Sequence, residues 1–348
     1  DMNTFRIILY IVCIIALLVV TLLLYLTLPE FKPEKIQVVD KADHIPVIHQ
    51  DTFNIVTWNI GYGGLGADMS FFYDGGKKVR TSQEKTLENL QMIKRKLKQF
   101  DHFDYLLLQE VDIAAKRSYR INQLTYLDQN LENFYAYFGV NYRVKYVPIP
   151  ITEPLGKVKS GIAILSRHQP GQVLRYDYPG KYPWPKSAFM LDRCFLVARY
   201  PLAGSAELVI INTHNSAYDD GNLKKEEMKF LKQFLLKTYH DGNYILVGGD
   251  WNQLPPGLKS SLQYGNSHTK DNTSVIAEQF MPVDWNWIFD PHIPTNRALD
   301  EPYSDTTHTR ILDFFLASPN IHPIAVETMD LKFAYSDHQP VYLKFALQ

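Results

Sequence analysis

The chain has little cysteine and no surplus of either charge. Its two cysteines, Cys13 and Cys194, cannot supply a disulfide framework, so they do not reveal the compartment in which it folds. Both are better explained as small apolar side chains than as nucleophiles. The formal net charge is −1 over 348 residues. Proteins that grip long nucleic acids usually carry a basic surplus, so this balance weighs against a nonspecific nuclease.

Repeats and low-complexity tracts are also absent, but the chain does have one long apolar run. Residues 7–28 carry no charge, and a helix of that length can span the hydrocarbon core of a bilayer, about 30 Å. A cleaved signal peptide would have a shorter apolar region ending at small residues, which residues 22–28 lack. We therefore expect residues 1–28 to be a transmembrane anchor that is not cleaved.

The side of the membrane is harder to predict. Basic residues lie both before and after the apolar run, so the positive-inside rule does not decide: Arg6, Lys32, Lys35 and Lys41. The short N-terminal flank favours a single-pass signal-anchor with the rest of the chain outside the cytoplasm. Residues 29–51, with three prolines, are expected to be a linker that could reach about 60–70 Å when extended.

Residues 52–348 are expected to form one catalytic domain, since 46% apolar residues suffice for a large core. Helices are predicted from a capping box at 81–84 and an apolar stripe over 87–97, and from similar stripes over 121–131 and 223–239. Strands are predicted at 52–60, 103–109, 160–166, 194–200, 208–213, 244–248, 311–317, 322–327 and 340–346. This mixture indicates α/β packing of two sheets covered by helices, with a site at one edge.

Two motifs carry the most chemistry: residues 248–252 (GGDWN) and residues 336–340 (SDHQP). Asp250 and Asn252 are two positions apart, so at a strand end they face the same side. Asp337 and His338 combine a hard oxygen ligand with an imidazole, which suits a divalent cation beside a general acid or base. Together the motifs point to metal-assisted hydrolysis of a phosphate ester.

Three further residues stand at strand ends. Glu110 follows a buried strand and is a candidate Mg²⁺ ligand, although an exposed surface role is the ordinary explanation of a glutamate. Asn59 could complete the coordination sphere or merely form a turn before Gly61. His214 could donate to a phosphate oxygen or be a structural histidine.

Asp313 lies inside the apolar strand ILDFFLA. A buried carboxylate is costly unless it is paired, and His338 is the best candidate partner. Such a pair would fix the tautomer of the imidazole and raise its basicity. The alternative is a structural aspartate bonded to the backbone.

As an ordered set these segments resemble the endonuclease/exonuclease/phosphatase superfamily: TWNI at Asn59, LLLQEV at Glu110, SGIAILSR at 160–167, NTH at His214, GGDWN, ILDFF at Asp313 and SDHQP. The resemblance runs from Thr52 to the C-terminus. It implies a four-layer αββα sandwich of two mixed sheets, with the site at the strand ends between them.

The resemblance also implies roles for the candidate residues. The Mg²⁺ or Mn²⁺ site would be formed by Glu110, with Asn59 and Asp337. The nucleophilic water and the phosphate would be oriented by Asp250 and Asn252, with His214 on the phosphate and Asp313–His338 as a dyad. Either His338 or Asp250 could be the base that activates water for in-line attack.

The substrate is predicted from the anchor, the charge and the aromatic residues. A phospholipid or sphingolipid headgroup is favoured by the anchor and by the balanced charge. It is also favoured by aromatic clusters, because such rings suit a membrane interface; the clusters lie at 71–73, 182–184 and 285–287. Arg193 and Arg297 are the predicted substrate contacts, since guanidinium groups bind phosphate well. A membrane-anchored nuclease and a binding module without catalysis are the alternatives, and the ester is expected to be a phosphodiester or a phosphomonoester.

Overall fold

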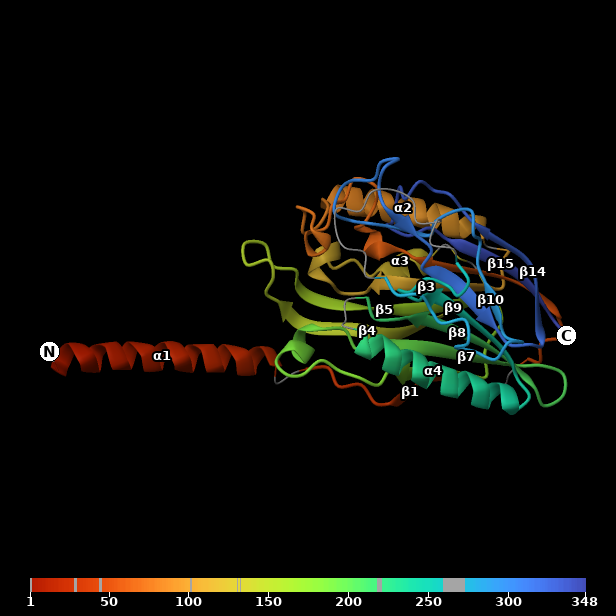
Figure 1. Cartoon of the computed structure of the whole chain (residues 1–348), viewed down its shortest axis with the longest axis horizontal. Coiled ribbons are helices and arrows are strands. Elements are labelled where there is room, and N and C mark those ends of the chain that lie inside the picture. The colour runs from red at the N-terminus through yellow and green to blue at the C-terminus, as the bar shows by residue number, and fades with distance from the viewer. Residues whose placement is uncertain are drawn as a thin grey trace.

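A computed structural model of the chain describes all residues except 1, 28–29, 44–45, 101, 130, 132, 218–220 and 259–272. The described residues form two β-sheets that pack face to face, with helices on their outer faces (Figure 1). The predicted four-layer αββα sandwich is thereby confirmed.

The first sheet has seven strands. In spatial order they are β1 (Ile36–Lys41), β6 (Gln172–Asp177), β7 (Cys194–Pro201), β8 (Glu207–His214), β9 (Tyr244–Asp250), β13 (Asp313–Ala317) and β10 (Asn286–Ile288). The second sheet has six: β14 (Ile321–Thr328), β15 (Val341–Leu347), β2 (Thr52–Asn59), β3 (Tyr105–Asp112), β5 (Gly156–Ser166) and β4 (Tyr135–Val147). A short ribbon joins β11 (Asn296–Arg297) to β12 (Thr309–Arg310).

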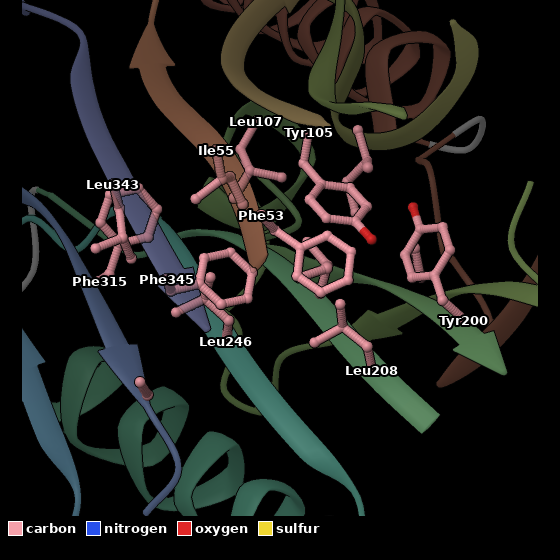
Figure 2. Packing of buried hydrophobic residues seen from close by; sticks show 14 of the residues in the cluster. Phe53, Ile55, Tyr105, Leu107, Tyr200, Leu208, Leu246, Phe315, Leu343 and Phe345 are labelled. Carbon is pink, nitrogen blue, oxygen red and sulfur yellow. The ribbon is translucent and has the colours of Figure 1, made fainter. Parts of the chain in front are cut away.

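Alternation along the strands produces the layers. In β2, Phe53 and Ile55 face the opposite sheet, while Val56 and Trp58 face the helix side. The layer between the sheets is filled by large apolar side chains from both, including stacked Phe53 and Phe345 (Figure 2). Helices α2 (Gln83–Gln99) and α3 (Gln123–Asp128) cover the second sheet, and α4 (Asn222–His240) covers the first.

Each sheet contains one parallel pair connected through a covering helix. These are β2–α2–β3 and β8–α4–β9, whereas the other pairings within the two sheets are antiparallel. The carboxyl ends of the four parallel strands meet at one end of the sandwich, which is where ligands bind in such folds. A buried amide pair ties the two sheets together just below this end. Gln109 donates to Asn212 at 2.7 Å, and Asn212 donates to two carbonyls of the second sheet.

Several local predictions need correction. The capping residue of α2 is Ser82, which accepts from Lys85 N at 3.1 Å; because Lys85 rather than Glu84 stands at the third helical position, the predicted capping box does not form. Strands β4 and β6 were missed, because many of their residues are polar or aromatic and only one face is apolar. The second predicted helix is shorter than its stripe, since α3 ends at Asp128.

The N-terminal region differs from a plain linker. Helix α1 (Met2–Thr27) is exposed from Met2 to Leu22 and extends away from the domain; it has the length and composition of a membrane-spanning helix. Within the expected linker 29–51, strand β1 pairs with β6 at the edge of the first sheet. In this strand Ile36 and Val38 are exposed and Val39 packs against the core between the sheets; the pairing shortens the free tether. The boundary at 28–29 lies outside the described residues, and the division into anchor and catalytic domain stays a prediction.

Candidate active site

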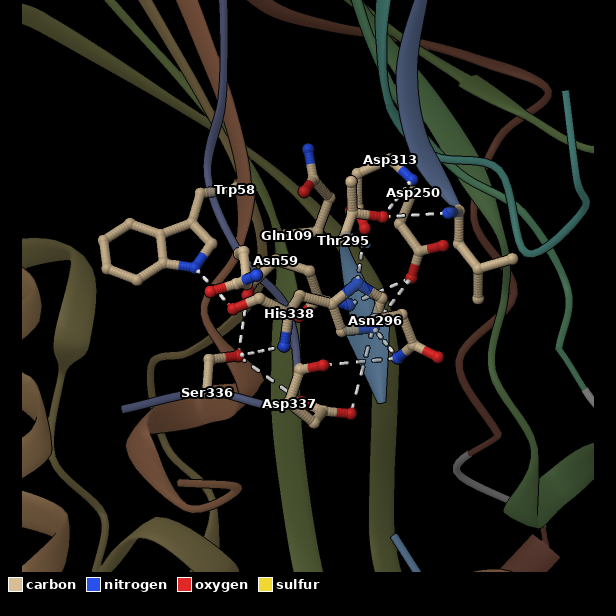
Figure 3. A network of polar contacts seen from close by, with 12 residues as sticks. Trp58, Asn59, Gln109, Asp250, Thr295, Asn296, Asp313, Ser336, Asp337 and His338 are labelled. Carbon is tan, nitrogen blue, oxygen red and sulfur yellow. Dashed lines mark hydrogen bonds and ion pairs between the residues drawn. The ribbon is translucent and has the colours of Figure 1, made fainter. Parts of the chain in front are cut away.

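The predicted pair of Asp313 and His338 forms in the structure. Asp313 opens β13 and is fully buried; its Oδ2 lies 2.7 Å from Nδ1 of His338 (Figure 3). The loop before β15 places His338, whose carbonyl accepts from Trp58 Nε1 at 3.1 Å. Thr295 accepts from the amides of Leu312 and Asp313 and so fixes the start of the strand. The carboxylate therefore holds the imidazole by a short charge-assisted hydrogen bond.

Carboxylates surround the His338 ring. Burial lowers the pKa of His338, but Asp313, Asp250 and Asp337 outweigh it and raise the pKa to about 10. Burial raises the pKa of Asp313 to about 6, against the nearby imidazole. The dyad is thus an ion pair around neutral pH in the metal-free protein.

Asp250 joins the two sheets at the centre of the site. Its Oδ2 lies 3.7 Å from His338 Nε2 and 3.4 Å from His214 Nε2. Asn59, at the end of β2, donates to the same oxygen at 3.0 Å, while Gly61 N donates to Asn59 Oδ1. The amide nitrogen of Asn59 therefore lies in the site, while its amide oxygen forms the turn before Gly61. The ends of β2, β8 and β9 converge here because two parallel pairs face each other across the core.

Glu110 and Asp337 form the acidic side of the site. Glu110 ends the buried part of β3 at a bulge and has a φ of 54°, a left-handed conformation that non-glycine residues rarely adopt. Its side chain is 25% exposed, more than the other carboxylates of the site. Burial raises the pKa of Asp337 to about 7, and Glu110 adds to the rise against His338. A divalent cation would relieve this crowding of like charge, so the donor set fits one.

A second acidic cluster could also be considered for a metal. Asp250, Asp313 and His338 have ligand atoms within 4.8 Å of one another. Asp313 and the Nδ1 of His338 are already engaged with each other at 2.7 Å, and Asp313 is fully buried. Glu110 and Asp337 are the better candidates, because their hydrogen bonds among the described residues come from the uncharged side chains of Asn59 and Ser336.

The sequence comparison agrees with this geometry. A model of the Endonuclease/Exonuclease/phosphatase family matches residues 56–338. The chain belongs to this family. Its members are metal-dependent phosphoesterases and nucleases, so the predicted enzyme class, a phosphoric ester hydrolase, is confirmed. No curated protein matches the chain in sequence.

Solved structures share the family fold. An endonuclease/exonuclease/phosphatase from Beutenbergia cavernae DSM 12333 aligns with a TM-score of 0.56 at 17% identity, over 86% of this chain and 72% of that one. The catalytic domain of human Nocturnin with bound sulfate gives 0.54 at 13% identity, over 88% and 97%. A Bacteroides vulgatus family member gives 0.55 at 13%, over 86% and 100%. At such identities the likeness establishes the fold alone.

One functional residue of this family site was missed by sequence reasoning. Asn296, in β11, places its Nδ2 at 2.9 Å from His338 Nε2. Arg310 donates from Nη2 and Nε to Asn296 Oδ1, at 2.9 and 3.2 Å, which fixes the orientation of the amide. The amide NH₂ therefore points at Nε2 and opposes the protonation that the surrounding carboxylates favour in the metal-free protein. Nothing in the segment around 296 signals this contact, because it depends on a bridge to residue 338.

His214 is held neutral. Burial, together with Arg193, His338 and Arg117, keeps the pKa of His214 well below its usual value. A neutral imidazole can donate a hydrogen bond to a phosphoryl oxygen without carrying a proton away from it. Arg117 is paired with Asp112 through two hydrogen bonds and stacks on Tyr62, so it has a structural role beside the site.

Asn252 lies beside Asp250, and its amide is partly used in the structure. Its backbone N donates to Asp250 Oδ1 at 2.9 Å, and its Nδ2 donates to the carbonyl of Asn215 at 3.0 Å. Like Glu110, Asn252 has a positive φ, of 49°. The residue is therefore positioned to hold Asp250, with its side-chain oxygen left to face a ligand.

The two predicted arginine contacts divide. Arg193 lines a small pocket together with Lys181, Ser216 and Glu227, and its charge acts on His214. Its Nη1 is buried and has no hydrogen-bond partner among the described residues. Such a group is suited to an anionic ligand.

The contacts of Arg297 favour a structural role over the predicted substrate contact. Arg297 is 1% exposed and donates to four carbonyls, those of Ala298, Glu301, Gly66 and Met69. The guanidinium fastens the glycine-rich loop after β2 to the segment after β11. Both Nη atoms are used on backbone oxygens, while Nε is buried with no hydrogen-bond partner among the described residues.

Proposed function

We propose that the protein is a Mg²⁺-dependent phosphodiesterase that attacks phosphorus with water in line and acts on the headgroup ester of a phospholipid or sphingolipid. One observation carries the chemistry. The Asp313–His338 pair, His214, Asp250 and Glu110 come from five different segments, and their polar atoms lie within 4 Å of a neighbour. Such a constellation provides a base, a donor and cation ligands around one point.

Each residue of the site has a distinct role in this mechanism. Asp313 orients His338 through Nδ1, and the Asn296 amide at Nε2 favours the unprotonated ring that a base requires. His338 accepts the proton of the attacking water, with Asp250 3.7 Å away holding the water in line. His214 and Asn252 donate to or orient the phosphoryl oxygens, and Arg193 binds a non-reacting anionic group.

The cation would be held by Glu110 and Asp337, with Asn59 between Asp250 and Glu110. When bound, it neutralises charge that develops on the phosphoryl oxygens and the leaving group. Carboxylate and amide oxygens are typical Mg²⁺ ligands, and Mn²⁺ is the alternative.

The lipid assignment rests on the N-terminal helix and on charge. We propose that α1 anchors the protein in a membrane as a single pass, with the domain outside the cytoplasm, so that the site works close to lipid esters. A net charge of −1 offers no general attraction for nucleic acid.

A membrane-anchored nuclease is the rival function. A structure of D. rerio TDP2 complexed with single-strand DNA product shares the fold at a TM-score of 0.50, which keeps this alternative open for the assay. A binding module without catalysis is disfavoured because every predicted catalytic position is filled and all but Arg297 face the site or its rim.

The deciding experiment is a substrate panel with the full-length protein in detergent or vesicles. Bis(p-nitrophenyl) phosphate with and without Mg²⁺ separates an enzyme from a binder. Hydrolysis is then measured separately under the same conditions for sphingomyelin, phosphatidylinositol and single-stranded DNA. Glu110→Gln serves as a matched inactive control. Hydrolysis of DNA but of neither lipid would overturn the lipid assignment.

A further inference from the structure

We infer that the end of the domain that carries the active site is a membrane-docking surface, whose partner is the lipid bilayer that holds α1. The surface consists of the tip of the β4–β5 hairpin, residues 148–155, and Trp184 in the connection between β6 and β7. This inference rests on the proposed function and deepens it, because it places the lipid substrate within reach of the site.

Large apolar side chains are exposed on this surface. Ile151 is 90% exposed, Trp184 59% and Ile149 42%. The arms of the hairpin are well packed, since Tyr142, Val144, Val147, Leu155 and Val158 are buried in one cluster. A rigid hairpin that presents isoleucine to solvent at its tip is therefore a built feature of the domain.

The structure sorts the aromatic clusters noted in the sequence. Phe71 and Phe72 pack against the cluster at the base of the hairpin, and Trp285 is buried against Tyr239 at the other end of the domain. Trp184 alone among the tryptophans is mostly exposed. Tryptophan is the residue most suited to the interface between lipid and water.

Both parts of the surface continue directly from the active site. In the second sheet, Ser160 of β5 pairs with Asp112, two residues beyond Glu110, so the hairpin projects past the site. In the first sheet, Phe195 of β7 pairs with Thr213, next to His214, and the connection carrying Trp184 precedes β7. Membrane contact at these tips would bring Glu110 and His214 close to the headgroups.

The anchor enters the domain at the same end. Strand β1 begins where β6 ends, with Ile36 opposite Tyr176 and Asp177 N donating to the carbonyl of Lys35. The chain between Thr27 and Ile36 can span only about 30 Å even when fully extended. Within this segment the Phe31 ring lies 5.5 Å from the guanidinium of Arg143, on β4.

The arrangement is visible in Figure 1, where α1 arrives at the end from which the yellow-green hairpin projects. Lys145, on the hairpin arm, lies 4.6 Å from the ring of Tyr25 in the last turns of α1. The hairpin therefore lies beside the end of the helix that leaves the membrane.

The charges around the tip fit an anionic lipid surface. Between residues 143 and 159 there are four basic residues, Arg143, Lys145, Lys157 and Lys159, and one acidic residue, Glu153. Glu153 pairs with Arg80 at 2.8 Å. An apolar tip flanked by cations is the pattern of segments that dip into the headgroup region.

The test uses the full-length protein in vesicles of phosphatidylcholine and phosphatidylglycerol. A bimane label is attached to Ile151→Cys or Trp184→Cys in a Cys13→Ala background, since Cys194 is buried. Val283→Cys is the matched control, because Val283 is fully exposed near Trp285, away from the site. Lipids with a nitroxide near the headgroup should quench the first two labels and spare the third. Equal, weak quenching at residues 151 and 283 would overturn the inference.

A second measurement separates docking from substrate choice. The double variant Ile151→Glu with Trp184→Glu should lower hydrolysis of lipid in vesicles by about fivefold or more, since two apolar side chains lose their burial. Its rate on soluble bis(p-nitrophenyl) phosphate should stay unchanged, as should both rates of Val283→Glu. If the labels are quenched but no lipid is hydrolysed, docking stands and the lipid assignment falls. If lipid is hydrolysed without quenching, the docking surface falls and the proposed function stands.

Discussion

The amide nitrogen of Asn296 lies 2.9 Å from Nε2 of His338, on the side of the ring opposite Asp313. The imidazole is thus held at both nitrogens, by a carboxylate on one and an amide donor on the other. Arg310 prevents the amide from turning over, because it donates twice to Asn296 Oδ1. The ring is fixed in place and in tautomer by side chains from three different segments.

Replacement of Asn296 should therefore impair catalysis without removing a substrate contact. In Asn296→Ala we expect kcat to fall about tenfold with KM unchanged, because the imidazole is no longer held in its orientation. A tenfold loss in rate corresponds to roughly 1.4 kcal/mol of transition-state stabilisation. In Asn296→Asp the added carboxylate favours the protonated ring, so the acidic limb of the kcat–pH profile should move to higher pH. Circular dichroism controls for folding. An unchanged pH profile in Asn296→Asp would contradict the positioning role.

The dyad should act as a unit in turnover. His338→Gln and Asp313→Asn are each expected to lower kcat by about a thousandfold or more, with most of the loss shared. The double variant should then be little worse than His338→Gln alone, as measured by initial rates on a chromogenic phosphodiester. Multiplicative losses would show that the two residues act independently.

The dyad should also affect stability as a function of pH. The folded-state pKa of His338 is raised from 6.5 to about 10, so the protonated ring stabilises the metal-free protein fully below about pH 6.5. That contribution is lost as the pH rises through 10. The difference in free energy of unfolding between the wild type and His338→Gln should therefore shrink from pH 6.5 to 10. Urea titrations in EDTA at a series of pH values measure it, and a difference that grows over this range would contradict the ion pair.

Metal should stabilise the wild type and not Glu110→Gln. Saturation at about 100 times Kd adds roughly 2.7 kcal/mol of stability to a protein that binds the ion only when folded. Without metal, Glu110→Gln should melt on the order of 2 °C higher than the wild type, because the repulsion of Asp337 is relieved. EDTA should abolish turnover and Mg²⁺ or Mn²⁺ restore it. A full Mg²⁺-dependent rise in Tm for Glu110→Gln would place the ion elsewhere.

Arg193 and Arg297 form a matched pair of substitutions. Arg193→Met should raise KM by about tenfold or more, because the substrate loses a charged hydrogen bond. Its Tm should stay nearly unchanged. Arg297→Met should destabilise the fold by about 3 kcal/mol or more, because four buried carbonyls lose their donor. Its KM should hardly change at low temperature. The opposite pattern would restore Arg297 to the substrate site.

Much of the site was predictable because the chemistry sits in short segments. A carboxylate inside the apolar strand ILDFFLA requires a partner, and His338 follows an acidic residue at a strand start, so the dyad could be inferred from desolvation cost alone. The roles of Arg193 and Arg297 could not be separated in this way. Arg193 precedes β7 and Arg297 lies in β11, and only the hydrogen-bond partners of their Nη atoms distinguish an anion contact from a backbone clamp.

Periodicity and desolvation act over a few residues, so local patterns along the chain were enough to predict the layers and the apolar helix at the N-terminal side. They also predicted the strand ends that carry Glu110, His214 and Asp250. Which side chains meet was settled by tertiary packing. Asn296 reaches His338 through a bridge over more than forty positions, and β1 ties the chain that leaves α1 to the active-site end. Contacts of this kind depend on register and on the crossing of sheets, which are set by the packing of the whole core and by no local pattern.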